Sequence, residues 1–173
     1  MINSLIILSA ILSSILFNSF LEWIIHGPLE HGKLSVLVGL RKSHIDHHDF
    51  YSREEGFANH SHGNSVAIPH YFFIPVTLIS WIVAWIIGHF LGSTVFVWCF
   101  VVTTMIHYIF FQYVHTSMHI PKGRWIERTK WFKKKMAEHV IHHRMDEDFE
   151  HPVNICVVCS WADRLFGTYF RRK

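Results

Sequence analysis

Histidine is the residue type in this chain whose number and spacing point to chemistry. The chain has 173 residues and 16 histidines, as many as its lysines and arginines together. Ten of the histidines fall into four short groups with the spacings HxxxxH, HxxHH, HxxxH and HxxHH: His26 and His31; His44, His47 and His48; His115 and His119; His139, His142 and His143. Neutral imidazole is a common ligand for iron, zinc, copper and nickel. The pattern therefore indicates a metal site whose metal the ligand type alone does not fix.

The spacing within each group decides which rings can point together. An α-helix turns by about 100° per residue, so positions three or four apart return to nearly the same face. We therefore expect each HxxHH triplet and the HxxxH pair to project from one side of a helix. His26 and His31 are five residues apart and would diverge on an ideal helix. The Gly27-Pro28 pair between them is expected to bend the chain and to aim both rings inward.

Repetition is what makes the metal interpretation strong. One HxxHH motif is weak evidence by itself, but this chain has two copies and two further pairs. Without a cation, ten converging rings would compete for hydrogen-bond donors when neutral and repel one another when charged. The sequence contains no HExxH motif, which disfavours a metalloprotease, and no ExxH motif, which disfavours a carboxylate-bridged di-iron bundle.

The elements that position these histidines are predicted to be membrane-spanning helices. No Asp, Glu, Lys or Arg occurs between residues 56 and 121, and burying charge in hydrocarbon is costly enough to explain such a gap. Apolar stretches at residues 2–25, 71–87 and 92–114 are each about long enough to cross a bilayer, and a tight turn is expected between the last two. We therefore predict an all-α integral membrane protein with three spans and a histidine-rich helical cap. A very apolar soluble core is the less favoured alternative.

A polar stripe on the first span indicates which face packs against other helices. Ser14, Asn18, Glu22 and His26 recur at every fourth position, so they share one helix face. Polar side chains are costly in lipid. The stripe is therefore expected to face the other helices.

Orientation follows from the basic residues. They flank the inner ends of the spans, at residues 33–53 and 122–173, and are absent from the 88–93 turn. The positive-inside rule then places the histidine segments 26–56 and 115–170 in the cytosol and the N-terminus outside. We treat residues 1–173 as one membrane domain. Residues 125–136 mix aromatic residues with lysines and are expected at the membrane interface, which argues against nucleic-acid binding.

The order of the four histidine groups resembles that of the fatty acid hydroxylase/sterol desaturase superfamily. Two flanking segments add to the resemblance: Glu22-Trp23 just before the first group, and WADRLFGTY at residues 161–169 after the last. The resemblance covers residues 26–169. It implies a non-haem di-iron oxygenase of the bacterial inner membrane or the endoplasmic reticulum. All ten grouped histidines would then be ligands of two iron ions, and zinc replaces iron in some purified members.

The implied reaction uses O2 and electrons from a separate ferredoxin- or cytochrome-type donor to hydroxylate a fatty acyl chain, sterol or related lipid taken from the bilayer. Desaturation and carotenoid hydroxylation within the same superfamily stay open, because the motifs do not separate them. A non-catalytic metal-binding membrane protein is the alternative from another class. It is disfavoured because a carrier should place ligands along the spans, where only His107 lies deep.

Five further residues are candidates for supporting roles. Asp46, Asp163 and His151 are predicted to lie behind the ligands, where carboxylates can accept the second N–H of a ligating ring. His107 and Phe111 are predicted to line a substrate channel. His107 lies two helical turns before His115, about 12 Å deeper in the membrane. Helix packing is the more ordinary role for residues such as His107 and Phe111. Glu138 is a further candidate to accept such an N–H, but we expect it by default to be a solvated surface charge.

Overall fold

The computed structural model describes residues 2–31, 38–51, 73–144 and 151–171, and every regular element in these ranges is helical. The elements are α1 (Ile2–Ile24), η1 (Ile25–His31), α2 (Val38–Tyr51), α3 (Phe73–Phe90), α4 (Thr94–His119), η3 (Trp125–Arg128), α5 (Lys130–His143) and α7 (Trp161–Leu165). Here η1 is a π-helix and η3 a 3₁₀-helix. The predicted all-α class is confirmed.

Three of the helices are long and apolar enough to cross a membrane, as predicted. They occupy Asn3–His31, Phe73–Phe90 and Thr94–His119. Large apolar side chains cover their outer faces; Trp98, for example, is 65% exposed and Ile109 64% exposed. All three helices end later than predicted: α1 continues through η1 to His31, α3 ends at Phe90 and α4 continues to His119. Residues 71 and 72, at the predicted start of the second span, lie outside the described residues.

The α3–α4 connection is the tight turn expected from the glycines. A side chain at Gly88 could not be accommodated, because its Cβ would overlap Val97 Cγ2 and would lie 2.9 Å from the Ser93 carbonyl oxygen. Gly92 has φ of 60°, a left-handed conformation that glycine adopts without strain. The Ser93 hydroxyl then caps α4 by accepting from the Phe96 N–H at 3.2 Å.

Helix α1 packs against α4 through the predicted polar stripe as well as through apolar contacts. The Ser14 hydroxyl donates to the Phe100 carbonyl oxygen at 3.0 Å, and the Asn18 amide donates to Thr104 Oγ1 at 3.1 Å. Around these bonds lies a buried apolar cluster: Ala10, Ala84, Phe96, Phe100 and Val101. The prediction that the stripe faces other helices is therefore confirmed.

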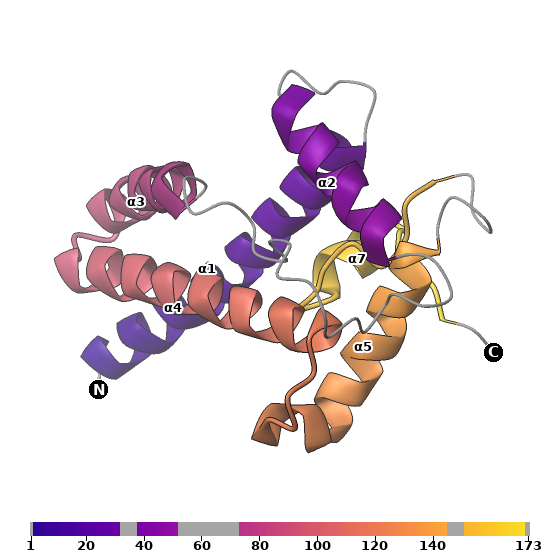
Figure 1. Ribbon diagram of the computed structural model, residues 1–173. Coiled ribbons are helices and arrows are strands. Elements are labelled where there is room, and N and C mark those ends of the chain that lie inside the picture. Colours follow the sequence, from indigo (N-terminus) through magenta and orange to yellow (C-terminus); the bar gives the residue numbers. More distant parts are fainter. Residues whose placement is uncertain (1, 32–37, 52–72, 145–150, 172–173) are drawn as a thin grey trace.

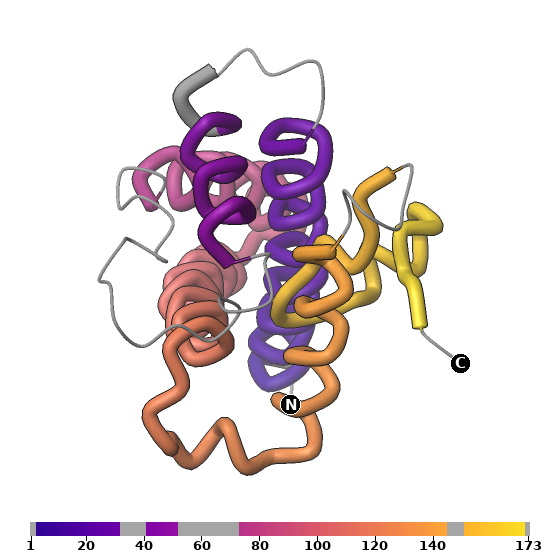
Figure 2. The backbone as a smooth tube through the Cα atoms, turned by 45° about the vertical axis from the view of Figure 1, so that its right-hand side comes forward, coloured from indigo at the N-terminus to yellow at the C-terminus, as the bar shows by residue number. Residues whose placement is uncertain are grey.

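The cap is built at one end of the helical bundle. Figure 1 shows α2, α5 and α7 gathered there, while α3 and the first half of α1 lie at the other end. Figure 2 shows how the chain leaves α4, passes through η3 and turns back into α5. A second apolar cluster packs α4, η3 and α5 against one another: Phe111, Val114, Met118, Ile126, Phe132 and Val157. The ends of η1 and α4 and the cap helices consequently meet around a shared interior.

Candidate metal centre

The ten grouped histidines lie together in this interior as two groups of five. Within each group the candidate ligand atoms all lie within 4.8 Å of one another. Cluster one consists of His26, His31, His44, His48 and His142, and cluster two of His47, His115, His119, His139 and His143. The two clusters adjoin, because the His48 ring of cluster one stacks on the His143 ring of cluster two with centroids 4.1 Å apart.

Each HxxHH helix contributes to both clusters. Helix α2 places His44 and His48 in cluster one and His47 in cluster two, whereas α5 places His142 in cluster one and His139 and His143 in cluster two. The rings three and four apart do share a helix side, as the spacing predicted. Residues four apart join the same cluster, and the residue between them is turned toward the neighbouring cluster.

His26 and His31 converge because of a π-helix rather than a simple bend. Element η1 covers Ile25–His31 and contains Pro28. A π-helix forms i→i+5 hydrogen bonds, so residues five apart return to nearly the same face. The two ring centroids are 5.6 Å apart. In a π-helix, the HxxxxH spacing therefore places both rings on nearly the same face, as the HxxxH spacing does in an α-helix.

The ring nitrogens of cluster one are spaced as the ligands of one metal ion would be. The Nε2 atom of His31 lies 2.8 Å from that of His44 and 3.3 Å from that of His142. The Nε2 atoms of His142 and His26 are 3.0 Å apart. Metal–imidazole bonds of about 2.1 Å that meet at right angles put their nitrogens roughly 3.0 Å apart. In cluster two, Nε2 of His119 and Nε2 of His139 are also 3.0 Å apart.

Hydrogen bonds on the other side of the rings set which nitrogen carries the proton. Nδ1 of His26 donates to the Ile155 carbonyl oxygen at 2.7 Å, and Nδ1 of His142 donates to the Val153 carbonyl oxygen at 2.8 Å. Nδ1 of His44 lies 3.2 Å from the Glu30 carboxylate. Each bond leaves an Nε2 lone pair directed into cluster one, and ligating histidines are held in this way.

Burial keeps the rings in the form that binds a cation. It lowers the pKa of His44, His47, His139, His142 and His143 well below the usual value, and neighbouring rings lower it further. These imidazoles are therefore neutral at physiological pH. Nε2 of His47 and Nε2 of His48 are buried and have no hydrogen-bond partner among the described residues. A metal ion would satisfy these lone pairs, so the residues fit a two-metal centre.

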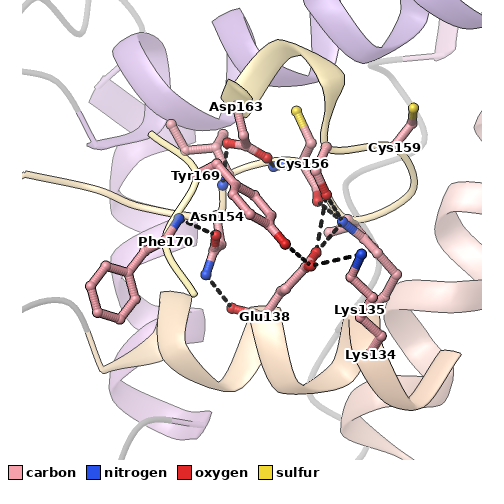
Figure 3. Close-up of polar contacts among 12 residues, drawn as sticks. Lys134, Lys135, Glu138, Asn154, Cys156, Cys159, Asp163, Tyr169 and Phe170 are labelled. Atoms are coloured by element: carbon pink, nitrogen blue, oxygen red, sulfur yellow. Dashed lines mark hydrogen bonds and ion pairs between the residues drawn. The ribbon is translucent and has the colours of Figure 1, made fainter. Parts of the chain in front are cut away.

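The carbonyls behind cluster one belong to a C-terminal segment, residues 153–170, that a polar network fixes. The buried Asp163 carboxylate accepts from the N–H groups of Ile155 and Cys156 at 2.9 and 3.0 Å. Asn154, whose φ is 52°, donates through its amide to the Glu138 carbonyl oxygen and accepts from the Phe170 N–H. Figure 3 shows these contacts between α5 and the segment.

A second part of the network joins the same segment to α5 through a buried ion pair. The Lys135 ammonium lies 2.7 Å from the Glu138 carboxylate and also donates to the Cys156 carbonyl oxygen at 2.8 Å. The Tyr169 hydroxyl donates to Glu138 at 3.1 Å (Figure 3). Burial alone would raise the pKa of Glu138, but the attraction of Lys135 and three hydrogen bonds hold it below its usual value. Glu138 is 7% exposed, so the expectation of a solvated charge was wrong.

Gly27 allows this segment to approach η1 closely. A Cβ at Gly27 would lie 2.8 Å from Ile155 Cδ1. Ile155 is the residue whose carbonyl accepts from His26. The glycine in the first histidine group thus leaves room for the Ile155 side chain, whose end would have to shift to admit a larger residue.

The three residues predicted to lie behind the ligands differ in their burial. Asp163 is fully buried and accepts from the N–H of Ile155, the residue whose carbonyl oxygen accepts from His26. The Asp46 carboxylate instead pairs with Lys42 at 2.7 Å on the exposed side of α2, and His151 is exposed. His107 and Phe111 both line one cavity beside His26.

Sequence reasoning missed Glu30 as a support for a ligand. Glu30 is 3% exposed and lies against His44. Its only sequence signal is a carboxylate inside the first histidine group, next to His31. The backbone carbonyls of Val153 and Ile155 were missed as well, because a main-chain acceptor has no signature in the residue type.

Comparison with known proteins gives one match. The family model described as fatty acid hydroxylase matches residues 11–168, which include all four histidine groups. No curated protein and no solved structure matches the chain.

Proposed function

The chain belongs to the fatty acid hydroxylase family, and from this premise we propose that it is a membrane di-iron oxygenase that hydroxylates a lipid-like substrate with O2 and external electrons. The observation that supports this most directly is the pair of adjoining clusters, each with five histidine ligand atoms within 4.8 Å of one another. Each cluster would hold one metal ion through up to five of these histidine nitrogens.

The chain's own part in this chemistry is to hold and shield the centre. Neutral rings supply lone pairs, and the Val153 and Ile155 carbonyls fix the ring tautomers of cluster one. Burial of His119, His139 and His142 keeps bulk water away from the rings. Bound iron would supply the activation of O2 and the oxidation of an unactivated C–H bond; zinc could occupy the same ligands in purified protein.

The balanced reaction states what the partners must provide. One oxygen atom of O2 enters a C–H bond as a hydroxyl group, and the other leaves as water. This uses two electrons and two protons. We propose a ferredoxin- or cytochrome-type protein as the electron donor and the bilayer as the source of the lipid. The centre would lie on the cytosolic face of the bacterial inner membrane or the endoplasmic reticulum, because the basic residues flank this end of the spans.

Labelled O2 tests the proposal and its nearest alternative together. Purified protein in lipid nanodiscs is loaded with iron, supplied with a reductase and ferredoxin, and given ¹⁸O2. We expect O2 consumption and ¹⁸O in a lipid product. A desaturase would instead form a double bond and release both oxygen atoms as water. If no O2 is consumed with a ferredoxin-type donor or with a cytochrome-type donor, the result would support a non-catalytic metal-binding protein.

A matched pair of variants ties the activity to the centre. His142→Ala removes a buried ring of cluster one, so we expect lower metal content and no product. His89→Ala removes an exposed histidine at the end of α3, whose ring stacks on Trp85. It should retain both metal ions and full activity.

A further inference from the structure

The outer face of α4 continues onto η3 and the first turn of α5. Large apolar side chains on this face of α4 are exposed and recur every three or four residues: Trp98, Val102, Ile106, Ile109 and Tyr113. On a helix that is long and apolar enough to span a membrane, such a face is the one that contacts lipid. The Trp131 ring of α5 stacks on Phe110 of α4 with centroids 5.8 Å apart, and the Arg124 guanidinium lies 5.7 Å from the Tyr113 ring centroid. Residues 124–131 therefore border the lipid-facing side of α4.

Two exposed tryptophans in this segment have the character of side chains at a membrane surface. Trp125 is 78% exposed and Trp131 is also exposed. Ile126, next to Trp125, is buried in the apolar cluster that joins α4, η3 and α5, so the orientation of η3 is fixed with Trp125 turned outward. An indole ring has an apolar body and one N–H donor, and tryptophan is enriched where the hydrocarbon of a membrane meets water.

The charged side chains at the surface of this segment are all basic. Glu127 is the one acidic residue between positions 120 and 137, and its carboxylate is used within the segment. It accepts from the N–H groups of Lys122 and Gly123 at 3.1 and 2.8 Å and pairs with Arg124 at 3.1 Å. The exposed charged residues are Lys122, Arg128, Lys130, Lys133 and Lys134. The surface is therefore complementary to negative charge.

Helical spacing places some of these cations beside the tryptophans and one away from them. Lys134 lies three residues after Trp131 and four after Lys130, so it shares a side of α5 with both. Lys133 lies two residues after Trp131, about 200° around the helix, and projects to the opposite side. In η3, Trp125 and Arg128 are three residues apart, and a 3₁₀-helix aligns such positions.

We propose that Arg128, Lys130 and Lys134 bind the head group of an anionic phospholipid, with Trp125 and Trp131 at the membrane–water interface and the acyl chains against the outer face of α4. Such a lipid joins a negative phosphate to an apolar body, which matches a cationic surface that borders an apolar helix face. The site is separate from the metal centre, and its occupation does not depend on the oxygenase proposal.

Lys134 remains suited to this role although it lies near a carboxylate. Its ammonium is 3.9 Å from Glu138, but Lys135 already pairs with that carboxylate at 2.7 Å from inside the cap. The Lys134 side chain is exposed. Its charge therefore faces outward, where a lipid phosphate can approach it.

An acidic redox protein is the other class of partner that a basic surface suits. It would account for the lysines. It gives no reason for two exposed tryptophans next to the lipid-facing side of α4, one of them stacked on Phe110. A bilayer accounts for the aromatic and the basic side chains together, so the lipid is the occupant that the contacts favour.

Lipid titration of the full-length protein followed by native mass spectrometry tests the site. The protein is held in a neutral detergent, and phosphatidylglycerol or phosphatidylcholine with the same acyl chains is added. Each basic residue near an anionic lipid contributes about fivefold in affinity. We therefore expect the first phosphatidylglycerol molecule to bind at least about tenfold more tightly than phosphatidylcholine.

Variants at two adjacent lysines locate the site. Lys134→Gln should lower the affinity for phosphatidylglycerol about fivefold, and the triple variant Arg128→Gln, Lys130→Gln, Lys134→Gln should remove the preference over phosphatidylcholine. Lys133→Gln makes the same change in charge on the opposite side of α5 and is the matched control, which should retain the preference. Metal content of each variant shows that the cap has folded.

Fluorescence in nanodiscs tests where Trp125 lies. The difference in emission between the wild-type protein and Trp125→Phe gives the signal of Trp125 alone among the seven tryptophans. We expect phosphatidylcholine that is brominated near the head group to quench this signal more strongly than phosphatidylcholine brominated near the chain ends. No quenching by either lipid would place Trp125 in water and overturn the proposal.

Three other results would also overturn it. Equal affinity for the two lipids would show that the head group is not recognised, and an equal loss in Lys133→Gln and Lys134→Gln would show only a general attraction of the basic cap for anions. If the triple variant kept its lipid preference but raised the KM for ferredoxin, the surface would be a docking site for a redox protein. Lipid binding is measured without turnover, so these results leave the oxygenase proposal to its own test with ¹⁸O2.

Discussion

The two histidine clusters use the same ligand type but take their rings from different elements. In cluster one, rings from η1, α2 and α5 are oriented by polar partners that include a carboxylate and two backbone carbonyls. In cluster two, the rings come from α2, α4 and α5 and are packed against aromatic side chains. Tyr51 lies 4.2 Å from the His119 ring, centroid to centroid, and Phe111 stacks on His115 at 5.7 Å.

This difference shows that cluster one depends on a segment outside the spanning helices. Its carbonyl partners lie in residues 153–155, and buried Asp163 holds those residues in place. Cluster one is also the one that borders the apolar cavity, through His26. We therefore expect changes in the C-terminal segment to weaken one metal site selectively, which would not occur if the ten rings formed a single undivided site.

Substitutions of two adjacent histidines on α5 test the two-cluster arrangement and should have the largest effect. His142→Ala should remove about one metal equivalent from cluster one, and His143→Ala about one from cluster two, because each loses a buried ligand. Both variants should lose hydroxylation entirely. Metal analysis of purified protein measures the loss, with His89→Ala as the control. If either variant lost both equivalents while its fold was intact, the two clusters would have to be treated as one site.

Glu30→Gln should have the next largest effect, and only on cluster one. Gln offers one acceptor oxygen in place of two, and its NH2 group cannot accept from His44 Nδ1. Losing such a partner weakens metal binding by about 10–100-fold. The metal affinity of cluster one is measured by chelator titration in a protein that also carries His143→Ala, because only cluster one keeps all five histidines there. Unchanged affinity there would show that Glu30 is a packing residue.

Much of the fold could be predicted from the sequence because membranes impose a simple rule on composition. The charge-free stretch from 56 to 121 located two spans, and the glycines at 88 and 92 located the turn between them. Helical spacing also predicted which side of α2 and α5 carries the rings. These are local properties, and neighbouring residues in the sequence are enough to determine them.

The division into two clusters could not be predicted in this way. Whether His47 joins His44 or His139 depends on how α2 and α5 cross, which no single helix encodes. The π-helix at His26–His31 was expected only as a bend, because Gly27-Pro28 signals a break in the α-helix but not the geometry that replaces it. Lys135 was assigned to an interfacial segment, but it is 4% exposed, since Glu138 and Cys156 satisfy its charge inside.

Asp163→Asn tests the dependence of cluster one on the C-terminal segment. The carboxylate accepts from Ile155 N–H, Cys156 N–H and the Thr168 hydroxyl, and an amide has only one acceptor oxygen. We expect a loss of about 2–3 kcal/mol in the free energy of unfolding, measured by thermal unfolding in detergent. The metal affinity of cluster one should fall more than that of cluster two. Equal losses at both clusters would indicate that the segment supports the whole cap.

The smallest expected effect comes from Asp46, an exposed acidic residue on α2, which is one of the two helices that contribute to both clusters. Its carboxylate pairs with Lys42, and the two side chains are 59% and 75% exposed. Exposed pairs four residues apart on a helix contribute less than about 0.5 kcal/mol. Asp46→Asn should therefore leave metal content, metal affinity and activity unchanged, in contrast to Glu30→Gln, which replaces a buried carboxylate that lies against a ring. Because both changes replace an acidic side chain near His44 with its amide, the pair separates direct contact from the effect of nearby acidic groups in general. A loss of affinity in Asp46→Asn comparable to that in Glu30→Gln would mean that charge near α2, and not the bond to His44, governs cluster one.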